Sequence, residues 1–225
     1  MADNKQTETL ATALNAKLEK SKGLVFAICG IVVALILIIA VVATVKSKST
    51  EKGIEQIDSI SYALTKDAAD LSEDDVLARE NTALEQLAPL SAKGGIVGLR
   101  ANMLIAELKF AQKNYSEARS AWLKAISAKK SAYTTPLCYF NAAVCSEEMN
   151  DTDNAIAYYE AASGDEDFLL IDHALFSLGR VNESAQNYDA AKAAYEKLVE
   201  LRSSASWGQL AQSRLIALKA AGNIQ

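Results

Sequence analysis

The sequence contains little of what catalytic and metal sites are commonly built from. It has one histidine, His173, and three cysteines among its 225 residues. One histidine excludes both a multi-histidine metal site and a catalytic triad that histidine would orient. Gly94, Gly95 and Gly98 do not form a phosphate-binding loop, because no Gly-Lys-Ser/Thr follows them. We therefore predict a protein that is not an enzyme and that binds neither a cofactor nor a metal.

The cysteines do not form a disulfide framework. Cys138 and Cys145 are seven residues apart, which on one helix separates them by about 10 Å along the axis. A disulfide needs Cα atoms within about 7 Å, so we predict that they remain free thiols. Free thiols are more typical of a reducing compartment, or of an exported protein from an organism that seldom makes disulfides.

Proline and glycine are also scarce, with two and ten residues, and the formal net charge is only −5. This composition, together with abundant alanine, favours helices and disfavours a β-sandwich. The acidic clusters are predicted to be solvated surface. The mildly acidic balance excludes nucleic acid, or an anionic membrane surface, as the main partner of the chain beyond residue 45.

One long apolar run stands out against this background. Residues Gly23–Val45 carry no charge and are bracketed by Lys22 and Lys46. A helix of this length spans the roughly 30 Å of a bilayer's hydrocarbon core. The alternatives are a cleaved signal peptide with Val41 and Ala43 at its cleavage site, and a buried core helix. We predict a short tail at residues 1–22 and a transmembrane helix at residues 23–45.

The orientation of this span follows from lysines on its two sides. Four lie before the run and three in the first residues after it: Lys5, Lys17, Lys20 and Lys22, and Lys46, Lys48 and Lys52. The positive-inside rule then favours a cytoplasmic N-terminus and an extracytoplasmic C-terminal domain. The unpaired cysteines favour the opposite side. We expect a single-pass protein of a bacterial inner membrane with its C-terminal domain extracytoplasmic.

Residues 46–97 are predicted to form a helical hairpin. One apolar stripe follows the first helix at Ile54, Ile57, Ile60 and Leu64, and a second is expected at Val76, Ala83, Leu84, Leu87 and Leu90. Ser72, followed by three acidic residues, has the pattern of a helix start. Pro89 and the glycine pair at residues 94 and 95 indicate its end.

From residue 98 the sequence repeats itself. The alanines Ala118, Ala155 and Ala191 are 37 and 36 residues apart. Each follows a polar turn and precedes Trp122, Tyr159 or Tyr195 at a matching offset, and each has a small residue upstream at Ala106, Ala143 or Gly179. A half unit follows, with Trp207, Leu210 and Ala211. A period in the mid-thirties with two helices per unit is typical of a stacked helical array.

These residues resemble the tetratricopeptide repeat family, over about residues 99–221. The units are two or three residues longer than the family's usual 34, and its closing prolines are absent. The resemblance implies an all-α protein, in which residues 98–225 form a right-handed α-solenoid of helical hairpins with a C-terminal capping helix. Residues 46–97 would be a degenerate first repeat.

In this family, four positions on the first helix of each unit line a concave groove that binds protein segments. The resemblance carries them to Arg100, Met103, Glu107 and Phe110; to Leu137, Phe140, Val144 and Glu147; and to His173, Phe176, Arg180 and Glu183. Met103 and Glu107 stand where the family's clamp for acidic peptides has Lys and Asn, so that activity is not implied. The apolar members of the set suit an apolar peptide or an amphipathic helix. Alternatively, the C-terminal helix covers them.

An apolar anchor, a hairpin and a repeat array together also resemble the ancillary SecYEG translocon subunit family (YfgM-like). That resemblance implies a membrane-anchored scaffold for protein–protein interactions near the protein-export machinery or its clients. The alternative is a structural adaptor of a cell-envelope or secretion assembly that acts by self-association, as a homo-oligomer.

Overall fold

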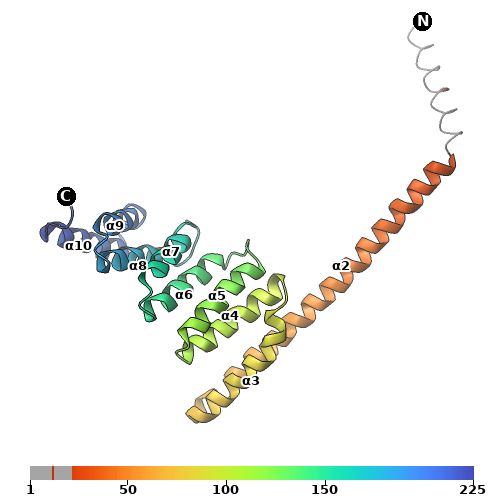
Figure 1. The fold of residues 1–225 in the computed structure, drawn as a ribbon, viewed down its shortest axis with the longest axis horizontal. Helices are drawn as coiled ribbons and strands as arrows, with labels where there is room; N and C mark the ends of the chain where they lie inside the picture. The colour runs from red at the N-terminus through yellow and green to blue at the C-terminus, as the bar shows by residue number, and fades with distance from the viewer. Residues whose placement is uncertain (1–11, 13–21) are drawn as a thin grey trace, which may run out of the picture. The chain divides into compact units, whose positions relative to one another are not determined.

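A computed structural model describes Thr12 and residues 22–225, except for the side chains of residues 24 and 25. The expected tail at residues 1–22 otherwise lies outside the described residues. In the part that is described, the regular structure is nine α-helices, α2 to α10, and one short 3-10 helix (Figure 1). The prediction of an all-α fold is confirmed. The chain divides into two compact units, residues 1–52 and 53–225.

Helix α2, Lys22–Thr65, contains the apolar run. Its large apolar side chains from Phe26 to Val45 are exposed by 48% to 76%. Among the described residues this is the one helix long and apolar enough to cross a membrane, and none of its most apolar stretch is buried. These facts remove the core-helix alternative and leave a membrane span or a signal sequence.

The end of α2 forms the predicted hairpin with α3, Glu73–Ser91, after a 3-10 turn at Ala68–Asp70. Ser72 caps α3, because its hydroxyl oxygen accepts a hydrogen bond from the Asp75 N–H at 3.2 Å. Ile57, Ile60 and Leu87 lie in the core between the helices. Val76 was expected in this stripe but is exposed, because it lies in the first turn of α3, before the part that packs.

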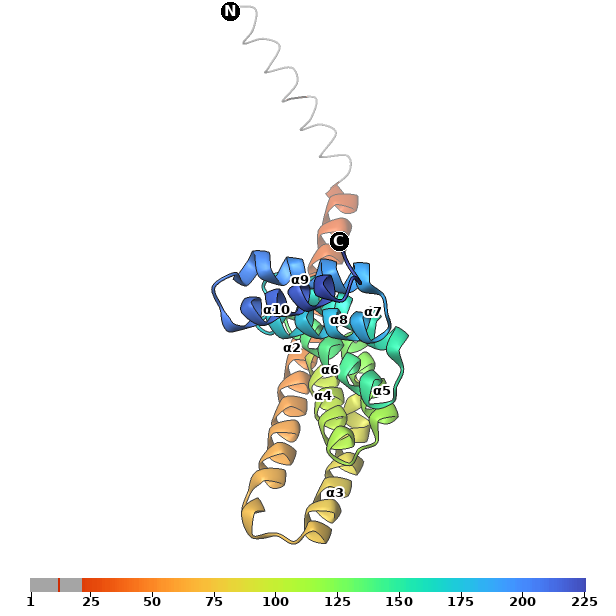
Figure 2. The ribbon, with the colours of Figure 1, turned by 90° about the vertical axis from the view of Figure 1, so that its left-hand side faces the viewer.

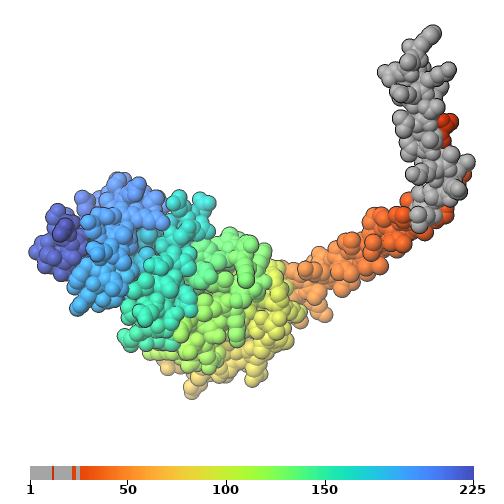
Figure 3. Space-filling view, turned by 45° about the horizontal axis from the view of Figure 1, so that its top comes forward, coloured from red at the N-terminus to blue at the C-terminus, as the bar shows by residue number. Residues whose placement is uncertain are grey.

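The repeats form three helix pairs and a final single helix. Their bounds are α4 Gly95–Ala111 and α5 Tyr115–Ala128, α6 Thr135–Glu148 and α7 Thr152–Ser163, α8 Ile171–Ser184 and α9 Tyr188–Arg202, and then α10 Ser206–Ala220. Each helix packs on the next in chain order, as Figure 2 shows, and Figure 3 shows the same order as bands from yellow to blue. We call α4, α6, α8 and α10 the first helices, and α5, α7 and α9 the second helices. The expected boundary at residues 97 and 98 lies within the first turn of α4.

Small residues allow the paired helices to approach closely. The upstream residues Ala106, Ala143, Gly179 and Ala211 are buried, as are the marker alanines of the second helices. Trp122, Tyr159 and Tyr195 fill the space between the helices and are at most 3% exposed. A Cβ atom at Gly179 would lie 2.4 Å from the Tyr195 ring, so this position tolerates no side chain without a shift of the ring.

The turn inside each helix pair has the same backbone. Lys113, Asn150 and Gln186 have φ of 60°, 58° and 63°, the left-handed region that glycine adopts most easily. After α4, the N–H groups of Lys113 and Asn114 donate to the carbonyls of Phe110 and Lys109, the two bonds of a Schellman motif. The same two bonds close α6, α8 and α10, and Gly222 holds the left-handed position in the last.

Candidate protein-binding groove

The twelve residues expected to line the groove lie on three first helices, as the resemblance implied. Helix α4 carries Arg100, Met103, Glu107 and Phe110; α6 carries Leu137, Phe140, Val144 and Glu147; α8 carries His173, Phe176, Arg180 and Glu183. Glu107, His173 and Arg180 are exposed, and the other nine are partly buried. The set therefore forms a mixed surface, on which every apolar member is partly buried.

The aromatic members of the set pack against the chain's own second helices. The Phe110 ring lies 5.2 Å from Tyr115, Phe140 lies 5.6 Å from Tyr159, and Phe176 lies 5.6 Å from Tyr195, between ring centroids. Their edge-on and tilted geometries are those that aromatic pairs prefer. Each ring thus belongs partly to the core of its unit and offers a partner only its remaining exposed part.

Helix α10 covers one end of this surface. The Trp207 ring lies 5.5 Å from Phe176 and 4.2 Å from His173. The C-terminal helix therefore packs on the α8 part of the apolar set, as the alternative expectation described. Helix α10 packs on α8 and α9, whereas Met103 and Val144 on α4 and α6 are partly buried against the cores of their own units.

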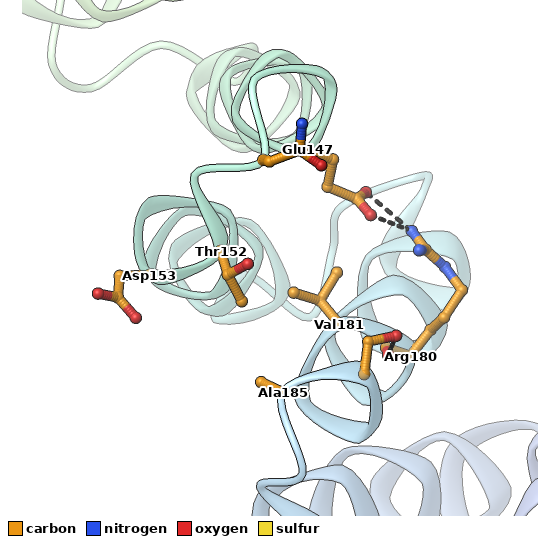
Figure 4. A pocket seen from close by; sticks show the side chains of 8 residues that line it. Glu147, Thr152, Asp153, Arg180, Val181 and Ala185 are labelled. Carbon is orange, nitrogen blue, oxygen red and sulfur yellow. Dashed lines mark hydrogen bonds and ion pairs between the residues drawn. The ribbon is translucent and has the colours of Figure 1, made fainter.

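Two of the three glutamates in the set, Glu147 and Glu183, form ion pairs within the chain. Glu147 accepts a hydrogen bond from the Tyr159 hydroxyl at 2.5 Å, and the Arg180 guanidinium pairs with it at 2.6 Å (Figure 4). Glu183 accepts one from the Tyr195 hydroxyl at 3.1 Å and pairs with Arg214 of α10. We call these two sets the Tyr–Glu–Arg clusters. Burial, together with the bond to the glutamate, raises the pKa of each tyrosine.

Each cluster joins consecutive units, because its arginine comes from the first helix of the next pair. Arg100 of α4 makes a comparable link to Asp58 of α2, at 2.6 Å. Such pairs are each worth about 0–1 kcal/mol when partly exposed. Their value is geometric, since they fix the spacing of the first helices.

Among the described residues, the step from α4 to α6 has no such ion pair. Phe110 occupies the position of Glu147 and Glu183, and Trp122 occupies the position of the two tyrosines. The buried indole N–H of Trp122 has no acceptor among the described residues. Glu107 lies here as well, close enough to Cys138 of α6 for its charge to raise the pKa of that thiol.

An open pocket of about 410 Å³ lies beside the first cluster (Figure 4). Its walls come from the end of α6, the start of α7 and the end of α8, and include Glu147, Thr152, Arg180 and Val181. This pocket was not predicted from the sequence. The sequence does carry a sign of the cluster beside it, because Glu and Tyr recur 36 residues apart, at Glu147 and Glu183 and at Tyr159 and Tyr195.

The remaining polar chemistry is structural. Cys138 and Cys145 are free and buried on α6, as expected from their spacing. Burial raises the pKa of Cys138 to about 12 and that of Cys145 to about 11, so neither thiol is a ready nucleophile at neutral pH. The described residues contain no group of three or more His, Cys, Asp or Glu placed to hold a metal ion.

Comparisons with known proteins agree with this geometry. The tetratricopeptide repeat family model matches residues 137–164 and 172–204, which contain α6–α7 and α8–α9. A "TPR repeat-containing protein" of Treponema pallidum (strain Nichols) is 33% identical over 150 residues, which cover 67% of this chain and 61% of that protein. This chain therefore spans less than two thirds of that relative's length.

Two solved structures match part of the chain. The apo form of RapI superposes with a TM-score of 0.53 at 17% identity, over 67% of this chain and 57% of that one. MamA gives a TM-score of 0.46 at 18% identity, over 69% and 91%. Residues 137–164 and 172–204 thus match tetratricopeptide repeats, a fold that suggests a scaffold for protein–protein interaction.

Proposed function

We propose that this protein is a membrane-anchored scaffold that binds partner proteins on the first-helix side of its repeat array. The observation that carries the proposal is the exposed apolar part of α2. Some twenty consecutive residues, each large one at least 48% exposed, have no apolar partner in the described chain. Exposed apolar area of this extent is unfavourable in water by about 25 cal/mol per Å², and a bilayer removes that cost.

The compartment and the partner class belong to the same proposal. The lysine balance around the run favours an extracytoplasmic array, and we propose the bacterial inner membrane as its location. The resemblance to the ancillary translocon subunit family supports exported polypeptides, or the export machinery itself, as partners. An anchor gives a weak binding surface a raised effective concentration of partners at the membrane.

Membrane extraction tests the anchor. We expect the full-length chain to remain with membranes washed in alkaline carbonate, and its mass to include the N-terminal residues. The double variant Ile36→Arg and Ile39→Arg should lower the membrane fraction, since each arginine costs about 2.5–3.5 kcal/mol near the centre of a span. The control, Val76→Arg with Leu77→Arg, changes two apolar residues that are exposed outside the run.

Two results would contradict the anchor. One is release of the unmodified chain by carbonate. The other is a mature protein that begins after residue 43, which would make the run a cleaved signal. Protease treatment of intact cells then fixes the side, because an extracytoplasmic array is digested only after the outer barrier is opened.

Self-association is the second candidate, and one surface favours it. Tyr62, Val76 and Leu77 are exposed by 64%, 36% and 46% at the end of the α2–α3 hairpin. An adaptor acting through this end would form dimers or larger species as its concentration rises. Sedimentation of the full-length chain in detergent separates the candidates, since the scaffold proposal expects a monomer across the concentration range.

A further inference from the structure

The α4–α6 step differs from the other steps between first helices in how its charges are satisfied. We define the α4–α6 joint as Met103, Glu107 and Phe110 of α4 with Cys138 and Val144 of α6. At the α2–α4, α6–α8 and α8–α10 steps, an arginine of the later helix pairs with a carboxylate of the earlier one. At the α4–α6 joint, Val144 stands one residue after the small residue Ala143, where Arg180 follows Gly179 in the next unit.

At this joint Phe110 stands where Glu147 and Glu183 stand in the later units, so an apolar pair replaces the ion pair. Glu107, which follows Ala106 as Arg180 follows Gly179, pairs with no cation among the described residues. No ion pair or hydrogen bond to its carboxylate is recorded among the described residues, whereas the nearest acid on α5, Glu117, pairs with Lys109 at 2.7 Å. Its side chain is exposed, yet partial burial still raises the pKa of Glu107. A carboxylate in this position gains most from a partner that brings a positive charge.

The surroundings of Glu107 are apolar and partly open. Met103 and Phe110 pack at the edge of the core formed around Trp122 and Cys138, and Val144 packs at the edge of the next core. All three remain partly exposed. The packing of α10 is on α8 and α9, where Trp207 meets Phe176. An apolar surface with a single unpaired acid is complementary to a segment that carries one base among apolar residues.

We propose that the α4–α6 joint binds a polypeptide segment that presents a lysine or arginine to Glu107 and apolar side chains to Met103, Phe110 and Val144. The inference rests on the proposed protein-binding function and narrows it to partners of one chemistry. Arg180 and Arg214 show that carboxylates on the first helices hold arginines in this array. A partner cation would make a pairing of the same kind with Glu107, at a different position on its helix.

Three short fluorescent peptides test the proposal. They are identical in leucine, alanine and serine content and differ only at a central residue, which is Lys, Gln or Glu. The full-length protein is held in uncharged phosphatidylcholine nanodiscs, and the signal from empty nanodiscs is subtracted. We expect the lysine peptide to bind at least about fivefold more tightly than the glutamate peptide, as one partly desolvated charge contact provides.

Variants locate this preference. Glu107→Gln should reduce it to less than about twofold, and Glu107→Lys should reverse it. Glu200→Gln and Glu200→Lys change an exposed acid of the second helix α9 by the same charge, and they should leave the preference as it is. Helix content by circular dichroism confirms that each variant is folded.

Three outcomes overturn the inference. One is equal binding of the three peptides, the second is a lysine preference that survives Glu107→Lys, and the third is the same loss of preference in the Glu200 variants. If the three peptides bind equally and cross-linking at Phe110 still blocks them, the protein-binding groove stands, but a cation plays no part in what it recognises. Absence of any peptide binding, together with no partner captured at the first helices, would instead contradict the proposed function itself.

Discussion

Single residues in this chain show where folding stability depends on protonation. Arg119 pairs with Asp151 at 2.5 Å, and this hydrogen bond holds the pKa of Asp151 below its usual range. A carboxyl whose pKa falls on folding stabilises the fold above its unfolded pKa of about 3.9. That contribution is lost as pH falls through the lower, folded pKa.

Asp151→Asn should therefore be less stable than the parent near neutral pH, and the difference should shrink as pH falls below about 4. Urea unfolding of both proteins across this range measures the effect. Asp153→Asn is the control, because Asp153 lies in the first turn of α7, which Asp151 caps, and is exposed without a recorded ion pair in the described chain. A deficit of equal size at acid and neutral pH would contradict the assignment.

Replacing a residue in a left-handed turn should stabilise the fold, in contrast to Asp151→Asn. Lys113 has φ of 60°, which costs a residue with a Cβ atom roughly 1 kcal/mol. Lys113→Gly should raise the free energy of unfolding by up to about 1 kcal/mol. Lys124→Gly, in the middle of α5, should lower it by about 1 kcal/mol. A destabilised Lys113→Gly in chemical denaturation would show that the Lys113 side chain, and not the backbone, determines this turn.

The buried thiols of α6 should resist alkylation. Burial raises the pKa of both Cys138 and Cys145 well above neutral, and the thiolate is the reactive form. Mass spectrometry after iodoacetamide treatment should find these two residues unmodified in the folded chain and modified in urea. Modification of either at the same rate in both states would mean that α6 opens readily.

At the scale of the helix pair, the close packing at Gly179 sets how closely α8 and α9 approach each other. A Cβ at this position meets the fully buried Tyr195 ring at 2.4 Å. Gly179→Ala should cost about 1–3 kcal/mol, the usual range for overpacking. Gly164→Ala is the matched control, since its Cβ would meet only carbonyl oxygens at 3.5 and 3.6 Å and should change stability by less than about 1 kcal/mol. Equal effects in thermal unfolding would refute the role of the ring.

The elements were predictable from the sequence because their determinants are local or periodic. Ser72 marks a helix start, and Ala118, Ala155 and Ala191 mark three second helices, because the same packing problem recurs in every unit. The left-handed residues Lys113 and Gln186 were not predictable, since neither is a residue type that favours this conformation. Val76 was wrongly predicted to lie in the buried stripe, because an apolar pattern does not show which part of a hairpin extends beyond the helices that it packs on.

The contacts between units were beyond sequence reasoning for a different reason. Arg180 and Glu147 are 33 residues apart, and their pairing depends on the rotation from one unit to the next. That rotation also decides that Trp207 meets Phe176 and that, among the described residues, no cation pairs with Glu107. The groove residues could be placed on their helices from the sequence, but their burial and charge partners required the assembled array.

At the scale of the whole molecule, the central claim is that partner proteins bind the first-helix side of the array. Photo-cross-linking in native membranes tests it most directly, with the cross-linker at Phe110, Phe140, Phe176 or the exposed His173 of the full-length chain. Lys124 and Glu200, exposed on second helices, are the matched control positions. We expect the same partner to be captured at several first-helix positions and at neither control position. Capture at Lys124 and Glu200, with none at the first helices, would contradict it.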